Sequence, residues 1–442
     1  MKSLQYSVKN PLGIHARPAA LLAQACTAIK SNVTLEYEGK TASGKNVLQI
    51  LALQAKKGSV LNITAEGPDE DKAIEIIQNV LSEIAPQDKS SDILRVAFYG
   101  TKDYDRLFFS ELSKDKGEGT YNVDITYFSS RLTIESAHLA EGFDAVCIFV
   151  NDEAPRDVVK VLAKGGVRLI LLRCAGFNNV DAEAAKEYGI KVLRVPAYSP
   201  YAVAEHAMAL LLTSIRRIHK AYIRTKDFNF SLEGMTGFDL HGKTVGVIGT
   251  GKIGRIFIDI CRGFGMNVIA YDKFPAKDSG IEYVSLDELW ERADIISLHC
   301  PLTDENKYMI NAETIAKMKK GVVILNTSRG ALINSEALLE GIKDRKIGAA
   351  CLDVYEEESN IFFHDYSNHI VNDDILARLI SMPNVIVTSH QAFLTREALA
   401  NIADTTLSNI REFYKTDRCA NEVCYKCGKI ADCKQLHDMK CF

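Results

Sequence analysis

The sequence of 442 residues lacks an excess of positive charge and a long apolar run. Lysine and arginine number 53 against 57 aspartates and glutamates, so nothing in this balance favours binding to nucleic acid. No stretch approaches 18 uninterrupted apolar residues, and we therefore expect no membrane span. The N-terminus shows no apolar stretch followed by a small-residue cleavage site, so we expect no signal peptide and a cytoplasmic location.

The composition is that of an ordinary globular chain. Hydrophobic residues make up 47% of it and charged residues 25%, which excludes wholesale disorder. At roughly 150 residues per domain, the length predicts about three domains.

Cysteine is distributed unevenly. Six of the 11 cysteines are scattered singly in apolar surroundings, as expected for small core side chains, but five fall in the last 24 residues. The end of the chain has the spacing of metal ligands, with Zn²⁺ as the first choice and an iron–sulfur cluster as the second. The predicted ligands are Cys424, Cys427, Cys433, His437 and Cys441. The alternative is a flexible tail with free or redox-reactive thiols.

Residues 1–88 have the pattern of a small α+β domain. Residues 32–39 and 59–67 alternate apolar and polar side chains, which predicts half-buried antiparallel strands. Residues 69–84 place isoleucine and leucine at helical spacing. The polar stretch 85–92 contains a proline and lacks periodicity, so we interpret it as a linker.

Beyond residue 93, apolar strand patterns alternate with helical ones. Strands that are apolar throughout and separated by helices are typical of parallel sheets covered on both faces. Two such series predict an α/β protein with two doubly wound, Rossmann-like domains, and a long helix over 206–222 between them. The expected boundaries are 93–197 with 391–418 for a substrate domain, 198–390 for a dinucleotide-binding domain, and 419–442 for the cysteine-rich tail.

A glycine-rich motif follows one of these strands and opens a helix. Gly249 permits a tight turn, Gly251 leaves room for a pyrophosphate, and Gly254 lets helix and strand approach. Asp272 ends the next strand, where it would bind the ribose hydroxyls and repel a 2′-phosphate. The motif therefore predicts NAD rather than NADP, although the adjacent Lys273 weakens that choice.

Three complementary side chains follow strands of the same series. His390 supplies an imidazole, the side chain suited to exchanging a proton, an acidic side chain would hold its charge state, and Arg329 suits a carboxylate. The acid comes from three consecutive glutamates, 356–358, among which the pattern does not choose. Of the other histidines, we expect His206 to cap or pack a helix and His299 to shape the coenzyme wall.

The span from about 93 to 418 resembles the D-isomer-specific 2-hydroxyacid dehydrogenase family, and within it the fermentative D-lactate dehydrogenases. The resemblance rests on ordered motifs, among them LRCAGFNNVD (172–181), GKTVGVIGTGKIG (242–254), NTSRGALI (326–333), LDVYEEE (352–358) and TSHQAFLT (388–395). It implies reduction of pyruvate to D-lactate by NADH, and an oligomeric chain. The open alternatives are a bulkier 2-keto acid, and a sensor or scaffold with vestigial activity.

The resemblance also assigns roles. His390 would be the acid/base with Glu358 as its partner, and Arg329 would bind the substrate. The substrate carboxylate would meet the backbone N–H groups of Ala175 and Gly176, with Tyr198 nearby. The coenzyme would contact Lys252, Ile253, Asp272, Cys300, Pro301, Asn306, Thr327, Ser328 and Asp353 besides the three glycines.

Residues 1–85 resemble HPr, the histidine-containing phosphocarrier protein of the bacterial phosphotransferase system. The motif is LGIHARPA (12–19), in which His15 precedes a helix N-terminus that favours a phosphoryl group, and Arg17 can pair with it. The resemblance implies phosphorylation of His15 and phosphotransferase proteins as partners. Asn46 occupies the position of a regulatory serine. The alternative is a module that has lost phosphotransfer and only docks.

Overall fold

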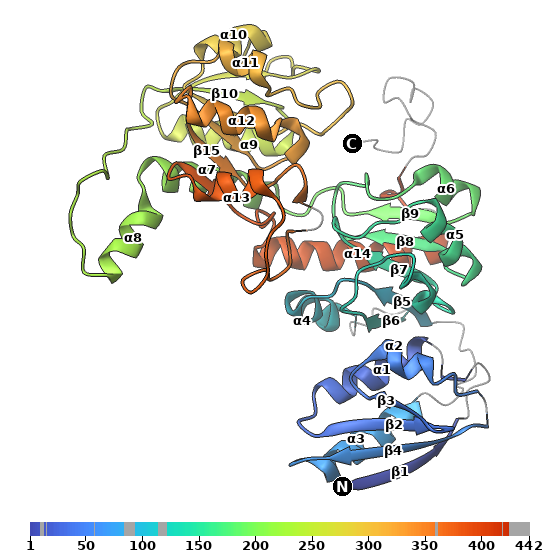
Figure 1. Ribbon diagram of the computed structural model, residues 1–442. Coiled ribbons are helices and arrows are strands. Elements are labelled where there is room, and N and C mark those ends of the chain that lie inside the picture. The colour runs from blue at the N-terminus through green and yellow to red at the C-terminus, as the bar shows by residue number, and fades with distance from the viewer. Residues whose placement is uncertain are drawn as a thin grey trace. The chain divides into compact units, whose positions relative to one another are not determined.

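The computed structural model describes residues 1–8, 13–14, 16–56, 58–83, 93–113, 122–358, 361–417 and 419–423. The chain divides into two compact units, one formed by Met1–Tyr198 with Leu399–Phe442 and the other by Ser199–Ala398 (Figure 1). Within the described ranges, every helix is too short or too polar to cross a membrane.

The N-terminal segment is built on an antiparallel sheet of four strands in the order β1-β4-β2-β3. The strands are β1 (Lys2–Ser7), β2 (Asn32–Tyr37), β3 (Lys40–Ser43) and β4 (Val60–Glu66), and the helices are α1 (Ala16–Thr27), α2 (Val47–Ala52) and α3 (Glu70–Glu83). Alternate residues of β2 and β4 are buried against the helices, in a core that includes Leu35, Ile63 and Ile77. The predicted α+β fold is confirmed, and β1, β3 and α2 are additional elements.

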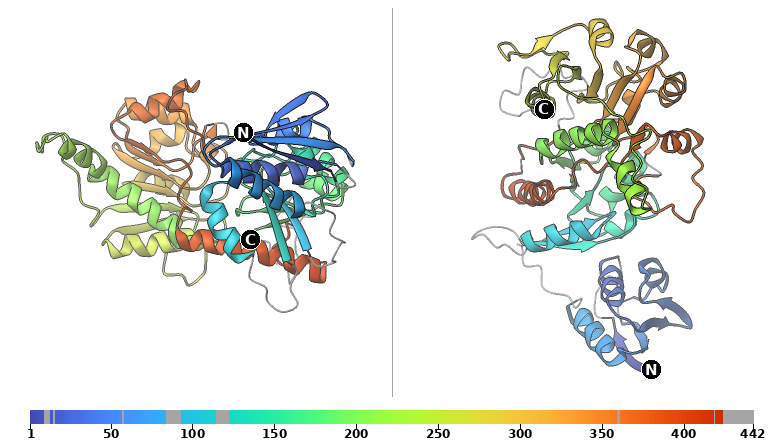
Figure 2. Two further views of the ribbon diagram at one scale, coloured as in Figure 1. Left: turned by 90° about the horizontal axis from the view of Figure 1, so that it is seen from below. Right: turned by 90° about the vertical axis from the view of Figure 1, so that its left-hand side faces the viewer.

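The second sheet has five parallel strands in the order β6-β5-β7-β8-β9. They are β5 (Ile93–Phe98), β6 (Asn122–Tyr127), β7 (Ala145–Ile148), β8 (Leu169–Leu172) and β9 (Lys191–Arg194). Its helices are α4 (Asp103–Leu112), α5 (Arg156–Lys164), α6 (Ala182–Glu187) and α14 (Arg396–Thr416), with a short 3₁₀ turn η1 (Ala137–Ala140). Strands β7 and β8 are buried along their whole length, and both views of Figure 2 show α14 alongside the sheet.

The segment Cys419–Val423 differs from the expected tail. The N–H of Val423 donates to the carbonyl of Val192 at 2.8 Å, and Leu193 forms an antiparallel bridge with Glu422. Cys419 is buried. The segment therefore extends the five-stranded sheet at its β9 edge. The sequence does not predict this pairing, because the paired stretch is too short to show a strand pattern.

The third sheet has seven parallel strands in the order β12-β11-β10-β13-β14-β15-β16. They are β10 (Thr244–Ile248), β11 (Asn267–Tyr271), β12 (Glu282–Tyr283), β13 (Ile295–Leu298), β14 (Val322–Asn326), β15 (Ile347–Leu352) and β16 (Val385–Val387). The helices are α7 (Pro200–Ile215), α8 (Ile218–Lys226), α9 (Lys252–Gly263), α10 (Leu286–Arg292), α11 (Ala312–Lys317), α12 (Ser335–Lys343) and α13 (Asp374–Ser381), with a 3₁₀ turn η2 (Gly330–Leu332). The strand order reverses between β10 and β13, where such sheets bind ligands. The two predicted doubly wound sheets are confirmed.

The single helix predicted over 206–222 is wrong, because the chain breaks between α7 and α8. Arg217 has the left-handed φ of 52°. The returning chain packs closely against the last turn of α7: a Cβ on Gly237 would lie 2.1 Å from the carbonyl oxygen of Ile215. The apolar periodicity continues through the break, so the pattern does not mark the point where the helix ends beside this close tertiary contact.

Candidate active site

The glycine-rich loop joins β10 to α9. Gly249 has a φ of 95°, and a Cβ there would lie 2.7 Å from the backbone of His299 and Cys300. A Cβ on Gly254 would lie 2.0 Å from the carbonyl oxygen of Gly249. By contrast, a Cβ on Gly251, the residue before α9, would meet nothing within 4 Å. The loop is thus tight beneath and open in front of the helix N-terminus, which fits a pyrophosphate.

Asp272 lies beside this loop at the carboxyl end of β11. One carboxylate oxygen accepts from the N–H of Thr250 at 2.6 Å and from its hydroxyl at 2.9 Å. The other oxygen accepts from the N–H of Phe274 at 2.9 Å. These contacts fix the carboxylate one strand away from the glycines, at the position where a dinucleotide fold binds the ribose hydroxyls.

Other predicted coenzyme residues follow β13 and β14. The side chain of Asn306 donates to the carbonyl of Pro301 at 2.8 Å, and the hydroxyl of Ser328 donates to that of Leu298 at 2.8 Å. The hydroxyl of Thr327 is buried and has no partner in the described part of the chain. Burial raises the pKa of the Cys300 thiol to about 11, so it stays protonated at neutral pH.

His299 lies behind the glycine-rich loop. Its ring packs against Phe257, with 4.9 Å between ring centroids, and its Nε2 is 2.8 Å from the hydroxyl of Ser297. Burial lowers the pKa of His299 to about 4. The ring is therefore neutral, and it acts as part of the wall beneath Gly249 and Gly254.

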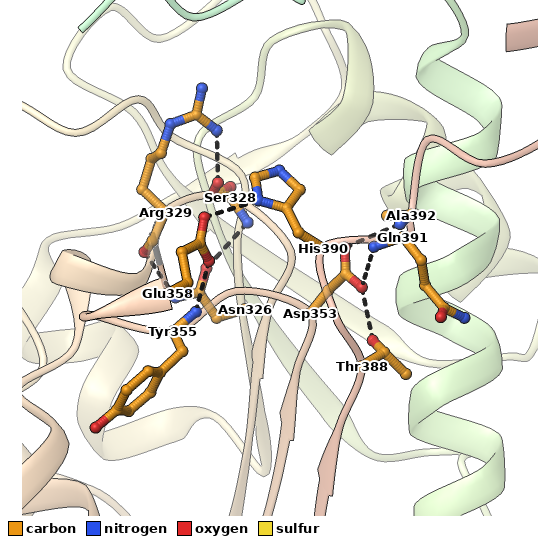
Figure 3. A network of polar contacts seen from close by, with 10 residues as sticks. All are labelled: Asn326, Ser328, Arg329, Asp353, Tyr355, Glu358, Thr388, His390, Gln391 and Ala392. Carbon is orange, nitrogen blue, oxygen red and sulfur yellow. Dashed lines mark hydrogen bonds and ion pairs between the residues drawn. The ribbon is translucent and has the colours of Figure 1, made fainter. Parts of the chain in front are cut away.

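His390 follows β16 and contacts one of the three glutamates. Its Nδ1 lies 2.8 Å from Oε1 of Glu358, whose Oε2 accepts from the N–H of Tyr355 at 2.9 Å (Figure 3). Glu356 instead accepts from the hydroxyl of Tyr308, and Glu357 is exposed. The structure thus separates three residues that the residue pattern by itself could not distinguish, and the one in contact with His390 is the one that the resemblance implied.

Arg329 follows β14 next to this pair. Its guanidinium donates to the carbonyl of Ser328 at 2.7 Å and extends to the same side as the His390 ring (Figure 3). The following residue, Gly330, packs so closely on the loop of Glu358 that a Cβ would lie 2.0 Å from the carbonyl carbon of Tyr355. This contact joins the two loops that hold Arg329 and Glu358.

Asp353 holds the loop of His390 from beneath. Its buried carboxylate accepts from the hydroxyl of Thr388 at 2.6 Å and from the N–H groups of Gln391 and Ala392, both at 2.9 Å. Its backbone carbonyl accepts from the N–H of His390, which has the left-handed φ of 52°, at 2.7 Å.

His206 completes this arrangement from α7. Its Nε2 lies 3.3 Å from Oδ1 of Asp353. Burial by itself raises the pKa of Asp353, but the hydrogen bonds from His206, Thr388 and the loop outweigh it, and the net shift is downward. Of the two expected roles for His206, capping is wrong, because the residue lies inside α7, whose N-cap is Ser199, and its side chain instead packs against Thr388 and Asp353. No sequence signal links positions so far apart.

Ala175, Gly176 and Tyr198 belong to the other compact unit. Ala175 and Gly176 follow β8, and both are partly exposed. The carbonyl of Tyr198 accepts from Asn401 at 2.6 Å.

Two predicted sites lie outside the described residues. They are His15 and the cysteine-rich tail with Cys424, Cys427, Cys433, His437 and Cys441. In the ranges that the structure describes, no group of three or more histidine, cysteine or acidic residues could hold a metal ion. Asn46, in contrast, has a clear structural role: its side chain caps α2 by accepting from the N–H of Gln49 at 3.2 Å.

The seven-stranded sheet and its glycine-rich loop define a dinucleotide-binding protein of the dehydrogenase class. Comparisons agree: the profile "D-isomer specific 2-hydroxyacid dehydrogenase, NAD binding domain" matches residues 208–392, and "PTS HPr component phosphorylation site" matches residues 2–83.

Individual relatives cover the chain beyond the N-terminal segment. D-lactate dehydrogenase of Escherichia coli is 51% identical over 333 residues, which is 75% of this chain and 100% of that protein. A 2-hydroxyacid dehydrogenase homolog of Haemophilus influenzae is 53% identical over 75% of this chain and 99% of its own length. The apo structure of the E. coli D-lactate dehydrogenase superposes with a TM-score of 0.68, at 49% identity, over 75% of this chain and 100% of that one. The chain belongs to the D-isomer-specific 2-hydroxyacid dehydrogenase family, with an HPr domain at its N-terminal end, and it is NAD-dependent.

Proposed function

We propose that the protein reduces pyruvate to D-lactate. The observation that carries the proposal is the 2.8 Å contact between His390 and Glu358 beside the guanidinium of Arg329. The extent of the similarity to the E. coli D-lactate dehydrogenase supports pyruvate as the substrate.

The coenzyme site would be formed by the glycine-rich loop, Asp272 and the residues after β13 and β14. When bound, NADH supplies the hydride that adds to C2 of the keto acid. Gly251 leaves space for the pyrophosphate, and the hydroxyl of Thr327, which has no partner among the described residues, offers a polar contact.

The protein's own groups would supply the proton and hold the substrate. Glu358 accepts from Nδ1 of His390, so Nε2 is the nitrogen left to give its proton to the alkoxide oxygen. Arg329 would bind the carboxylate and orient the carbonyl, and its charge would stabilise the developing oxyanion. The resemblance also assigns the N–H groups of Ala175 and Gly176, with Tyr198 nearby, to the substrate carboxylate.

The test is NADH oxidation with a panel of 2-keto acids, followed by chiral analysis of the product. We expect turnover of pyruvate to D-lactate, and a loss of kcat of at least about 100-fold in His390→Ala, the scale of general acid catalysis. The control is His138→Ala, an exposed residue of the other unit. Faster turnover of a bulkier keto acid would show that this acid, and not pyruvate, is the preferred substrate. The absence of turnover with every keto acid would favour a sensor or scaffold.

We further propose that His15, assisted by Arg17, accepts a phosphoryl group from phosphotransferase proteins and that its state changes the dehydrogenase rate. The HPr profile match and the motif around His15 support this proposal. Kinetics with and without the phosphoryl donor test it, with His15→Ala as control. Unchanged kcat and KM in verifiably modified protein would contradict the coupling.

For the tail, we propose a Zn²⁺ site formed by four of Cys424, Cys427, Cys433, His437 and Cys441, supported by their spacing alone. Metal analysis of the purified chain tests it, and iron in place of zinc would support a cluster.

We also propose a homo-oligomer. Large apolar side chains are exposed along α8 and the stretch after it, with Phe228 at 84% and Leu232 at 83% exposure. Sedimentation equilibrium tests this, and a monomer at micromolar concentration would contradict it.

A further inference from the structure

In the loop after β8, the carbonyl groups of consecutive residues each accept a hydrogen bond. The carbonyl of Cys174 accepts from the N–H of Val195 at 3.2 Å, and that of Ala175 accepts from the guanidinium of Arg194 at 3.0 Å. The carbonyl of Gly176 lies 3.3 Å from the thiol of Cys174. Two consecutive residues at the end of β9 therefore hold two consecutive peptide groups of this loop.

This pattern determines where the loop's N–H groups point. In a planar trans peptide the C=O and the following N–H point in opposite directions. Because the carbonyls of Cys174 and Ala175 face Val195 and Arg194, the N–H groups of Ala175 and Gly176 face away from them. Neither N–H has a hydrogen-bond partner within the described ranges, and both residues are partly exposed.

Arg194 is itself held firmly. Its side chain is buried, and its guanidinium lies over the ring of Phe177, 5.7 Å from the centroid. Its N–H donates to the carbonyl of Asn421 at 3.1 Å, and its carbonyl accepts from the side chain of Asn409 at 2.9 Å. The guanidinium thus contacts the residues on both sides of Gly176 from a fixed backbone position.

A cation bound to a peptide carbonyl also polarises that peptide group. The hydrogen bond from Arg194 to Ala175 is charge-assisted, and it makes the N–H of Gly176 a stronger donor because hydrogen bonds in series reinforce one another. An anion on the open side of the loop would therefore meet two aligned donors, backed by a positive charge.

We infer that Arg194 is a positioning residue for the substrate carboxylate: it turns and polarises the Ala175–Gly176 peptide without touching the substrate. The inference rests on the proposed function, in which this loop binds the carboxylate of the keto acid. It gives Arg194 an effect on substrate binding and none on the coenzyme, whose residues belong to the other unit.

The test is steady-state kinetics of the full chain with Arg194→Gln and Arg194→Lys. We expect Arg194→Gln to raise the KM for pyruvate, and the inhibition constant of the carboxylate analogue oxamate, about tenfold, the scale of one charge-assisted hydrogen bond. The KM for NADH should change less than about twofold. Arg194→Lys keeps a charge but loses the planar fork, so we expect an increase of about threefold.

The matched control is Arg156→Gln, which removes an exposed arginine of the same unit that pairs with Glu187. It should leave both KM values unchanged. A KM for pyruvate within twofold of wild type in Arg194→Gln would overturn the inference, as would a parallel rise in both KM values. If Arg194→Gln does not fold, an unchanged KM for pyruvate in Arg194→Lys overturns it. Wild-type protein without activity on any 2-keto acid would refute the proposed function, and the inference with it.

Discussion

Replacing Asp353 by asparagine tests how the loop of His390 is held. The carboxylate receives four donors, from Thr388, Gln391, Ala392 and His206, and its side chain is fully buried. An amide has only one acceptor oxygen. The orientation that keeps most contacts places the oxygen toward Thr388, Gln391 and His206, and turns the NH₂ group toward the N–H of Ala392.

The cost follows from this count. Two buried donor groups, the N–H of Ala392 and the new NH₂ group that faces it, are left without an acceptor at about 1–3 kcal/mol each, so we expect a loss of roughly 4 kcal/mol. For a unit the size of Ser199–Ala398 this lowers Tm by about 8–16 °C. Because the loop carries His390, kcat should also fall at least about tenfold.

The assays are calorimetry of the full chain as a function of pH, and pyruvate reduction. The pKa of Asp353 is lowered in the folded state, so its ionised form stabilises the protein above the unfolded-state pKa of about 3.9, and this contribution is lost as pH falls through the folded-state pKa. The Tm difference between wild type and Asp353→Asn should therefore shrink below about pH 4.

The control is Asp373→Asn in the same unit. Asp373 caps α13 by accepting from the N–H of Leu376 at 2.8 Å, and asparagine is an equally good cap, so we expect a change below about 1 kcal/mol. If Asp353→Asn kept its Tm within about 2 °C and its kcat within about twofold, the loop would not depend on this carboxylate.

Three further predictions concern the coenzyme and acid/base groups. Glu358→Gln should lower kcat at least about tenfold with the KM for NADH unchanged, whereas Glu357→Gln should behave as wild type; equal effects would refute the choice of Glu358. Gly251→Val should raise the KM for NADH without lowering Tm, because its Cβ meets open space. Gly254→Val should lower Tm, because its Cβ would lie 2.0 Å from the carbonyl oxygen of Gly249. A lower Tm for Gly251→Val together with an unchanged Tm for Gly254→Val would contradict the loop geometry. Asp272→Ala should raise kcat/KM for NADPH about tenfold by removing a like charge, and an unchanged NAD preference would assign selectivity elsewhere.

Strands and loops whose structure depends on consecutive residues were predictable from the sequence. The apolar strands of the two parallel sheets read as uninterrupted runs because both of their faces are buried. The glycine-rich loop was also predictable, since its turn, its close approach and its helix start are properties of one short segment. His390 and Arg329 were singled out as candidates because each follows such a strand.

Only the tertiary structure decided the relations between distant segments. The contact of His390 with Glu358, which the resemblance implied but the residue pattern did not select, depends on where the loop after β16 lies. The contact of His206 with Asp353 joins a helix to a sheet. The helix break at Arg217 coincides with the close approach of Gly237 to Ile215. The pairing of Cys419–Val423 with β9 joins a segment beyond α14 to an edge strand. Local periodicity determines elements because each depends on its neighbours in sequence, whereas these contacts depend on which elements folding brings together.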